Sequence, residues 1–208
     1  AEVRKNVLKY DEVMNEQRKV IYQRRGQILD GADLRDEALE YLDDSVGGAV
    51  ATYCVSDIAE EWDLEALLTE AKTLWPSQIE LAAFDAASST QELHDMLYDE
   101  ALALYETRER ELGEPVLRQV ERQVMLRIID QRWRQHLREM DLLREGIHLR
   151  AMGQKDPATE WQREGFEMFG MMMTGIANDF VKYVMHVQVS GDPAAQPEEP
   201  AIADMTET

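Results

Sequence analysis

The chain has 208 residues, of which 44% are apolar, and its 42 acidic and 22 basic side chains give a formal net charge of -20. This length and apolar content suffice for a folded core. Such an acidic excess repels nucleic acid phosphates, so we expect no nucleic acid partner. The single cysteine, Cys54, excludes an intrachain disulfide and a cysteine-based zinc cage. No apolar run reaches the roughly 20 residues of a membrane-spanning helix.

Acidic and basic residues are separated along the chain. Residues 30–106 hold 20 acidic and two basic side chains, whereas residues 107–165 hold 11 acidic and 12 basic ones. The first 25 residues are also rich in bases. We therefore expect the two basic-leaning segments to form one structural unit into which the acidic segment is inserted.

The first predicted element is a long amphipathic helix over residues 1–29. Apolar residues recur every seven positions, at Val7, Met14, Ile21 and Ile28. A second row, from Val3 through Tyr10, is interrupted by the polar Gln17. A helix of 28 residues is about 42 Å long, so its apolar stripe must pack along another long element.

Residues 30–114 are predicted to form an inserted helical domain. Its three expected helices cover residues 34–54, 64–74 and 91–112. Asp33, Asp63 and Thr90 are placed to cap their N termini. The pair Gly47-Gly48 lies within the first of these helices, which favours a close helix crossing at that point.

Residues 115–189 are predicted to form two long helices. Apolar residues with helical spacing cover positions 120–147 and 161–187. The connection, residues 150–157, contains a glycine and a proline and predicts a turn. Two long helices joined in this way normally pack antiparallel. The whole sequence thus predicts an all-α fold.

Residues 190–208 are rich in proline, alanine and acidic side chains. Their low apolar content predicts a disordered tail or linker. Truncated helices with exposed apolar stripes commonly associate, so self-association is a further possibility.

No motif in the chain indicates catalysis. The phosphate-binding pattern GxxxxGK[ST] is absent, and so is GxGxxG after a predicted strand, so we expect no bound nucleotide. The four histidines lack the spacing of a helical metal pair, and we assign surface or interhelix positions to His94, His136, His148 and His186. No metal is expected.

Several separated motifs resemble the SecA preprotein translocase family. They are RKNVLKYDEV at 4–13, QRKVIY at 17–22, DQRWRQHL at 130–137, GIHLR at 146–150 and QKDP at 154–157. They occur in the order and with the spacing of that family, and the resemblance covers about residues 1–190. It implies the carboxy-terminal half of such a motor, without its nucleotide-binding domains.

The resemblance assigns a part of that family's architecture to each segment. Residues 1–29 would be the first helix of the helical scaffold, and residues 30–114 the helical wing domain. Residues 115–189 would continue the scaffold and form a two-helix finger with its tip near 150–157.

The resemblance also implies an ATP-driven motor that moves preproteins through the SecYEG channel. Such a motor lies in the cytoplasm, peripheral on the inner face of the bacterial plasma membrane. ATP and Mg would bind to the parent's upstream domains, and this chain would hold no cofactor and have no enzymatic activity alone.

Two sets of site residues follow from the resemblance. The finger tip would contact preprotein and channel through Arg150, Met152, Gln154 and Lys155. Contact with the nucleotide-binding domains, and regulation of ATP hydrolysis, would involve Trp133, Arg134 and His136. The family often carries a bulky residue, frequently tyrosine, where this chain has Met152.

Two other functions are weighed against the motor. A free-standing helical adaptor or chaperone could bind apolar peptides through the methionine-rich stretch 168–173, because flexible thioether side chains suit varied apolar ligands. A hydrolase built on the abundant carboxylates and the histidines is the weaker alternative.

Overall fold

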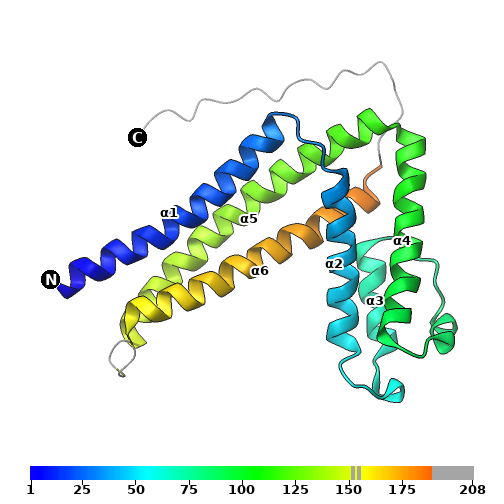
Figure 1. The fold of residues 1–208 in the computed structure, drawn as a ribbon, viewed down its shortest axis with the longest axis horizontal. Helices are drawn as coiled ribbons and strands as arrows, with labels where there is room; N and C mark the ends of the chain where they lie inside the picture. Colours follow the sequence, from blue (N-terminus) through cyan, green and yellow to red (C-terminus); the bar gives the residue numbers. More distant parts are fainter. Residues whose placement is uncertain (151–152, 154–155, 189–208) are drawn as a thin grey trace.

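The computed structural model describes residues 1–150, 153 and 156–188 (Figure 1). Its elements are α1 (Glu2–Leu29), α2 (Arg35–Tyr53), the short 3₁₀ helix η1 (Ala59–Glu61), α3 (Leu64–Leu74), the 3₁₀ helix η2 (Leu81–Ala86), α4 (Thr90–Leu112), α5 (Glu114–Arg150) and α6 (Pro157–His186). All regular structure in these residues is helical, which confirms the predicted all-α class. None of these helices is long and apolar enough to cross a membrane.

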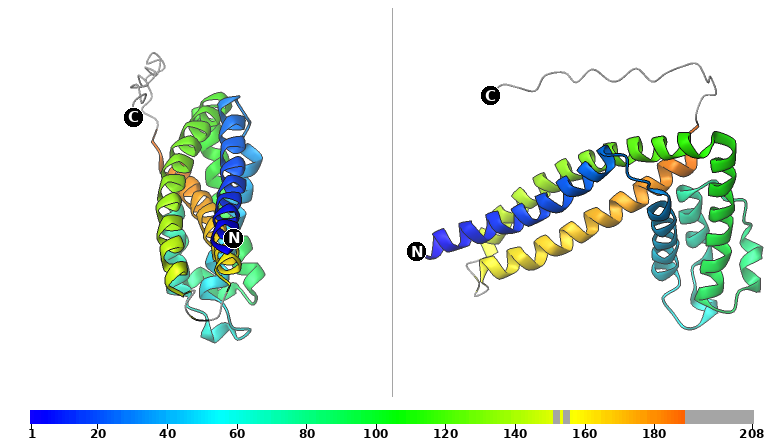
Figure 2. Two further views of the ribbon diagram at one scale, coloured as in Figure 1. Left: turned by 90° about the vertical axis from the view of Figure 1, so that its left-hand side faces the viewer. Right: turned by 45° about the horizontal axis from the view of Figure 1, so that its top comes forward.

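The helices form two groups. α1, α5 and α6 run side by side, and α2, α3 and α4 stand across one end of them (Figures 1 and 2). α5 and α6 are antiparallel, as predicted, and are joined through residues 151–156. Residues 151, 152, 154 and 155 of the predicted turn, and the predicted disordered tail, lie outside the described residues. The division into domains at residues 30 and 115 stays a prediction.

One apolar core continues through both groups. It includes Ile21 of α1, Leu97 of α4, Ile129 of α5 and Phe180 of α6. A smaller core near the turn is formed by the buried residues Tyr10, Met140, Ile147 and Trp161. In the stripe of α1, Tyr10, Ile21 and Ile28 are buried and Met14 is partly buried, whereas Val3 and Val7 are exposed. The stripe thus packs along α5 and α6, as predicted, except in the first two turns.

The capping residues explain where the helices begin. Asp63 caps α3 as predicted, because its carboxylate accepts a hydrogen bond from the amide of Ala66. The N-cap of α4 is Ser89 and not Thr90, which is the first helical residue. The Ser89 hydroxyl accepts from the amide of Glu92, whose carboxylate in turn accepts from the amide of Ser88. Such an exchange resembles a capping box.

The close helix crossing predicted at Gly47-Gly48 is wrong. A methyl group added at either position would meet no atom within 4 Å. The close approaches occur on α6, where a Cβ at Gly165 would lie 2.9 Å from Cε of Met140. A Cβ at Gly175 would lie 2.8 Å from Nη1 of Arg132. Two glycines of α6 thus leave room for side chains of α5.

The C-terminal end of α6 is held by the second group of helices. The guanidinium of Arg108, on α4, donates hydrogen bonds to the carbonyls of Val184, at 3.1 Å, and Val187. A cation at these carbonyls also interacts favourably with the helix dipole. Nearer the middle of α6, the side-chain oxygen of Asn178 accepts a hydrogen bond from the Ser45 hydroxyl of α2, at 2.6 Å.

A buried ionic network lies where α4 meets α5 at Gly113, whose φ is 87°. Glu121 is fully buried. One of its carboxylate oxygens accepts a hydrogen bond from the hydroxyl of Tyr105, at 2.7 Å, and the other lies 2.6 Å from Nε of Arg118. Arg118 also pairs with Glu109. Because each charge has a partner, burial of the network is tolerated, and it links the two helices across their junction.

Replacement of Phe180 by alanine is expected to lower the free energy of unfolding by about 3 to 5 kcal/mol, because it removes a buried ring that packs edge-on against Tyr41. Phe166→Ala on the same helix is the matched control, since Phe166 is 78% exposed. That control should change stability by no more than about 0.5 kcal/mol. Urea unfolding followed by circular dichroism measures both, and equal losses would contradict the packing described here.

Candidate interdomain contact site

Trp133, Arg134 and His136 lie within one turn of α5, but they do not share a face. Trp133 and His136 are buried at 7% and 1% exposure, with ring centroids 5.5 Å apart. Arg134 is exposed on another side of the helix. Arg134 is thus the most accessible of the three predicted contact residues, Trp133 is largely buried but lines the groove described next, and His136 is an interior residue. Their contact with another domain stays a prediction.

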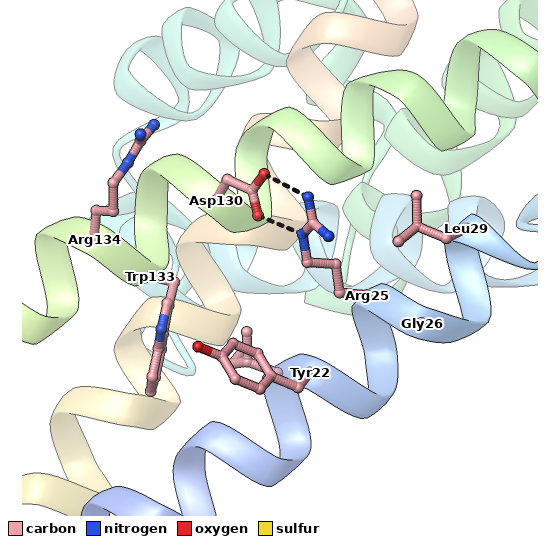
Figure 3. A pocket seen from close by; sticks show the side chains of 8 residues that line it. Tyr22, Arg25, Gly26, Leu29, Asp130, Trp133 and Arg134 are labelled. Carbon is pink, nitrogen blue, oxygen red and sulfur yellow. Dashed lines mark hydrogen bonds and ion pairs between the residues drawn. The ribbon is translucent and has the colours of Figure 1, made fainter. Parts of the chain in front are cut away.

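An open groove of about 550 Å³ lies between α1 and α5 beside these residues (Figure 3). α1 contributes Tyr22 and Leu29, whose side chains are 57% and 59% exposed. α5 contributes Trp133 and Arg134. The groove is thus mainly apolar, with charged groups at its edge.

A bidentate ion pair crosses this groove. Arg25 of α1 donates from Nε and Nη2 to the two carboxylate oxygens of Asp130 on α5, at 2.9 and 3.3 Å (Figure 3). The hydrogen bond with Asp130 raises the pKa of the Arg25 guanidinium. Both residues remain about 40% exposed, so the pair fixes geometry more than it adds stability.

A buried polar junction joins all three long helices. The side-chain amide of Gln17, on α1, donates to the carbonyl of Gly165 on α6, at 3.1 Å. The side-chain carbonyl oxygen of Gln17 lies 2.7 Å from Nε2 of His136 on α5. Since Gln17 is the acceptor in this second bond, His136 carries its proton on Nε2. Gln17 and Gly165 were not predicted as site residues.

Burial lowers the pKa of His136, and the nearby Glu139 offsets part of this effect. Nδ1 of the ring is buried and has no hydrogen-bond partner among the residues that the structure describes. A second proton on the ring would therefore place a charge in the interior without an acceptor. The neutral imidazole is the form that fits this junction.

Only one of the four predicted tip residues lies within the described residues. Arg150 ends α5 and pairs with Glu164 of α6 through both guanidinium Nη atoms, at 2.5 and 3.0 Å. This pair is exposed and ties the two helices together next to the turn. Met152, Gln154 and Lys155 lie outside the described residues, so their role at the tip stays a prediction.

Among the described residues no three histidine, cysteine, aspartate or glutamate side chains are placed to hold a metal ion. His94 pairs with Asp43, at 2.8 Å, and His186 bonds a backbone carbonyl of its own helix. In the methionine-rich stretch, Met172 is buried, whereas Met171 is 73% exposed.

Comparison with known proteins identifies a family. A family model described as SecA Wing and Scaffold domain matches residues 1–188. A protein translocase subunit SecA from a Nocardioides species is 47% identical, over 90% of this chain and 21% of its own length. A protein translocase subunit SecA 1 from Mycolicibacterium paratuberculosis is 47% identical, over 94% and 22%. The chain thus spans about a fifth of the length of these relatives.

The burial of neutral His136 predicts a pH dependence of stability. Its folded-state pKa lies below the value of about 6.5 expected in the unfolded chain. Between these two values the unfolded state binds more protons, so this group makes stability fall as the pH falls below about 6.5. The slope for one proton is at most about 1.4 kcal/mol per pH unit.

Unfolding free energies at pH 7.5 and 5.5 test this prediction. The matched variant is His136→Gln, whose amide can still donate to Gln17 but does not titrate. The wild-type chain is expected to lose more stability than this variant over the interval. An equal loss in the two proteins would show that His136 is not the responsible group.

Proposed function

This chain belongs to the SecA wing and scaffold domain family, and we propose that it is the scaffold and two-helix finger of an ATP-driven protein translocase motor. The observation that carries the proposal is the antiparallel pair α5–α6, braced by α1 over much of its length (Figure 1). α5 has 37 residues and α6 has 30, so the pair extends over about 45 Å or more. Such a rod transmits position from one end to the other.

The two ends of the rod suit different tasks. At one end, α6 is fixed to the wing helices by Arg108 and by the packing of Phe180 against Tyr41. At the other end, Arg150 and Glu164 join the two finger helices just before the turn. We propose that this turn, with Met152, Gln154 and Lys155, contacts the preprotein and the SecYEG channel.

The groove between α1 and α5 is the proposed contact with the motor's nucleotide-binding domains, which would carry ATP and Mg. Arg134 offers the direct contact, because it is exposed at the groove. Trp133 and His136 would act through the packing of α1, α5 and α6, since both are buried. A shift of these helices relative to one another would change this contact with the nucleotide-binding domains, and so the rate of ATP hydrolysis. The motor would lie in the cytoplasm, against the inner face of the plasma membrane.

The exposed apolar residues of α6 favour a second candidate, an adaptor that binds apolar peptides by itself. Phe166 and Met171 are 78% and 73% exposed, and side chains of this kind often mark binding surfaces. Titration of the isolated chain with a labelled signal peptide separates the two functions. Tight binding without the upstream domains would favour the adaptor.

In the full-length motor, Met152→Ala is expected to slow preprotein transport about tenfold, because the lost contact of one apolar side chain is worth on the order of 1.5 kcal/mol. Met171→Ala is the matched control, an exposed methionine on α6 away from the turn. Transport into membrane vesicles and ATP hydrolysis are measured together. The tip-contact role is wrong if both variants transport at the wild-type rate.

A further inference from the structure

One nitrogen of the buried His136 ring takes no part in the polar junction of the long helices. Nε2 carries the proton and donates to the side-chain carbonyl of Gln17, at 2.7 Å. Nδ1 of the neutral ring therefore keeps its lone pair, which has no partner among the residues that the structure describes. The ring is only 1% exposed, so bulk water does not reach this lone pair. It is available to a ligand that enters the protein.

A cavity of about 150 Å³ lies beside this ring, between α5 and α6. Its lining includes Arg132, His136 and Glu139 of α5, and Met168, Met171 and Met172 of α6. The lining residues all belong to these two helices, whereas Gln17 belongs to α1. Because Nε2 is directed to α1, Nδ1 is the ring nitrogen left to face the cavity. We call this space the methionine cavity.

The three methionines of the cavity follow spacings of three and four residues, which place them on one face of α6. Met172 is buried, Met168 is partly buried, and Met171 is 73% exposed. Thioether groups thus extend from the interior to the surface, so a small ion can enter past Met171. The next residue, Met173, is not part of the lining. It provides a natural comparison on the same helix.

The groups around the methionine cavity favour a soft metal ion. Thioether sulfur selects Cu(I) over hard cations such as Mg²⁺, which prefer oxygen ligands. Imidazole nitrogen suits copper as well. The positive charge of Arg132 is balanced by Asp179, at 2.7 Å, and Glu139 adds a negative charge. A cation in the cavity is therefore not opposed by an unbalanced positive charge.

The hydrogen bond of His136 has the form found at metal-binding histidines. Such a ring usually donates its other N–H to a carbonyl or carboxylate, which fixes both the tautomer and the orientation of the ring. The carbonyl of Gln17 has this role here, and the Gln17 amide is itself fixed by its hydrogen bond to the carbonyl of Gly165, at 3.1 Å. Nδ1 is thus held unprotonated, which is the state that a metal ion requires.

We propose that the methionine cavity binds one soft monovalent metal ion, Cu(I) or its redox-inert analogue Ag(I). The ligands are Nδ1 of His136 and the sulfur atoms of Met168 and Met172, and Met171 adds a third sulfur at the entrance. This donor set differs from a cluster of histidine, cysteine and carboxylate side chains, which the described residues do not form. The ion joins α5 to α6 at the level of Gln17. The site does not depend on the proposed function in protein transport.

Titration of the chain with Ag(I), added as silver nitrate in chloride-free buffer, tests the proposal. The protein is isotope-labelled at its methionine methyl groups and carries Cys54→Ala, because the thiol of Cys54 would compete for a soft ion. The NMR signals of Met168 and Met172 are expected to shift and to saturate at a single bound ion. Met96, on α4, should not respond. Equal shifts of all methionines, without saturation, would overturn the proposal.

Two variants remove ligands and leave the packing nearly unchanged. His136→Gln retains a donor to Gln17 but lacks Nδ1, and the pair Met168→Leu and Met172→Leu replaces sulfur at similar volume. Each variant is expected to bind Ag(I) more weakly by on the order of tenfold or more. Met173→Leu is the matched control and should bind like the parent. Circular dichroism checks the fold, and unchanged affinity in either folded variant would contradict the site, as would an equal loss in the control.

Two further measurements identify the kind of ion and its effect on the helix pair. Cu(I), kept reduced under argon, is expected to shift the same methionine signals, whereas Mg²⁺ should leave them unchanged. A response to Mg²⁺, or none to Cu(I), would refute the assignment to soft donors. Ag(I) should also raise the Tm of the parent, because it binds only the folded chain at this site, and should not raise it when Met168 and Met172 are both leucine. Equal Tm shifts in the two proteins would show that the ion binds elsewhere.

Discussion

Burial of α6 on several sides is the constraint on which the arrangement depends. α6 contacts α1, α2, α3 and α5, so it is the element that both groups of helices share. Its buried side chains include Trp161, Met172, Ile176, Phe180 and Val184. A helix with so wide an apolar surface is unstable in water, and neighbours must gather around it. Gly165 and Gly175 allow side chains of α5 to approach it closely.

Apolar packing alone would leave the register of α1, α5 and α6 weakly defined. Gln17 supplies the missing specificity, because its amide has partners on both other helices. A shift of any helix by one turn would separate these groups and leave buried polar atoms without partners, which costs more than the loss of an apolar contact. Polar residues at single positions of a helix seam often fix register in this way.

The sequence predicts the helices and their directions well, because periodicity and capping are local. Pro157 and Asp63 mark helix starts within one residue of the observed positions. Errors arise where neighbours compete or where distant elements decide. Ser89 and Thr90 are both good caps, and only the exchange with Glu92 selects Ser89. Gly47 and Gly48 indicated a crossing, but α6 approaches its neighbour elsewhere.

The candidate site was predictable only in part. Trp133, Arg134 and His136 occur in one motif, yet the motif does not reveal that two of them face the interior. Gln17 appeared as a break in an apolar row, and such a break could have been interpreted as a buried polar residue. Its partner Gly165 is 148 residues away, and no local pattern connects the two. No local pattern indicated that the carboxylate of Asp130 would pair with Arg25 either.

The anchoring of α6 by Arg108 has a consequence for the dimensions of the molecule. Arg108 fixes the C-terminal end of α6 at the carbonyls of Val184 and Val187, so the position of the opposite end depends on the number of residues in the helix. Each residue inserted between Val184 and Pro157 would advance the first turn of α6 by about 1.5 Å and rotate it by about 100°. Only insertions of whole turns, matched in α5, would preserve its orientation, so the length of the rod can change only in coarse steps.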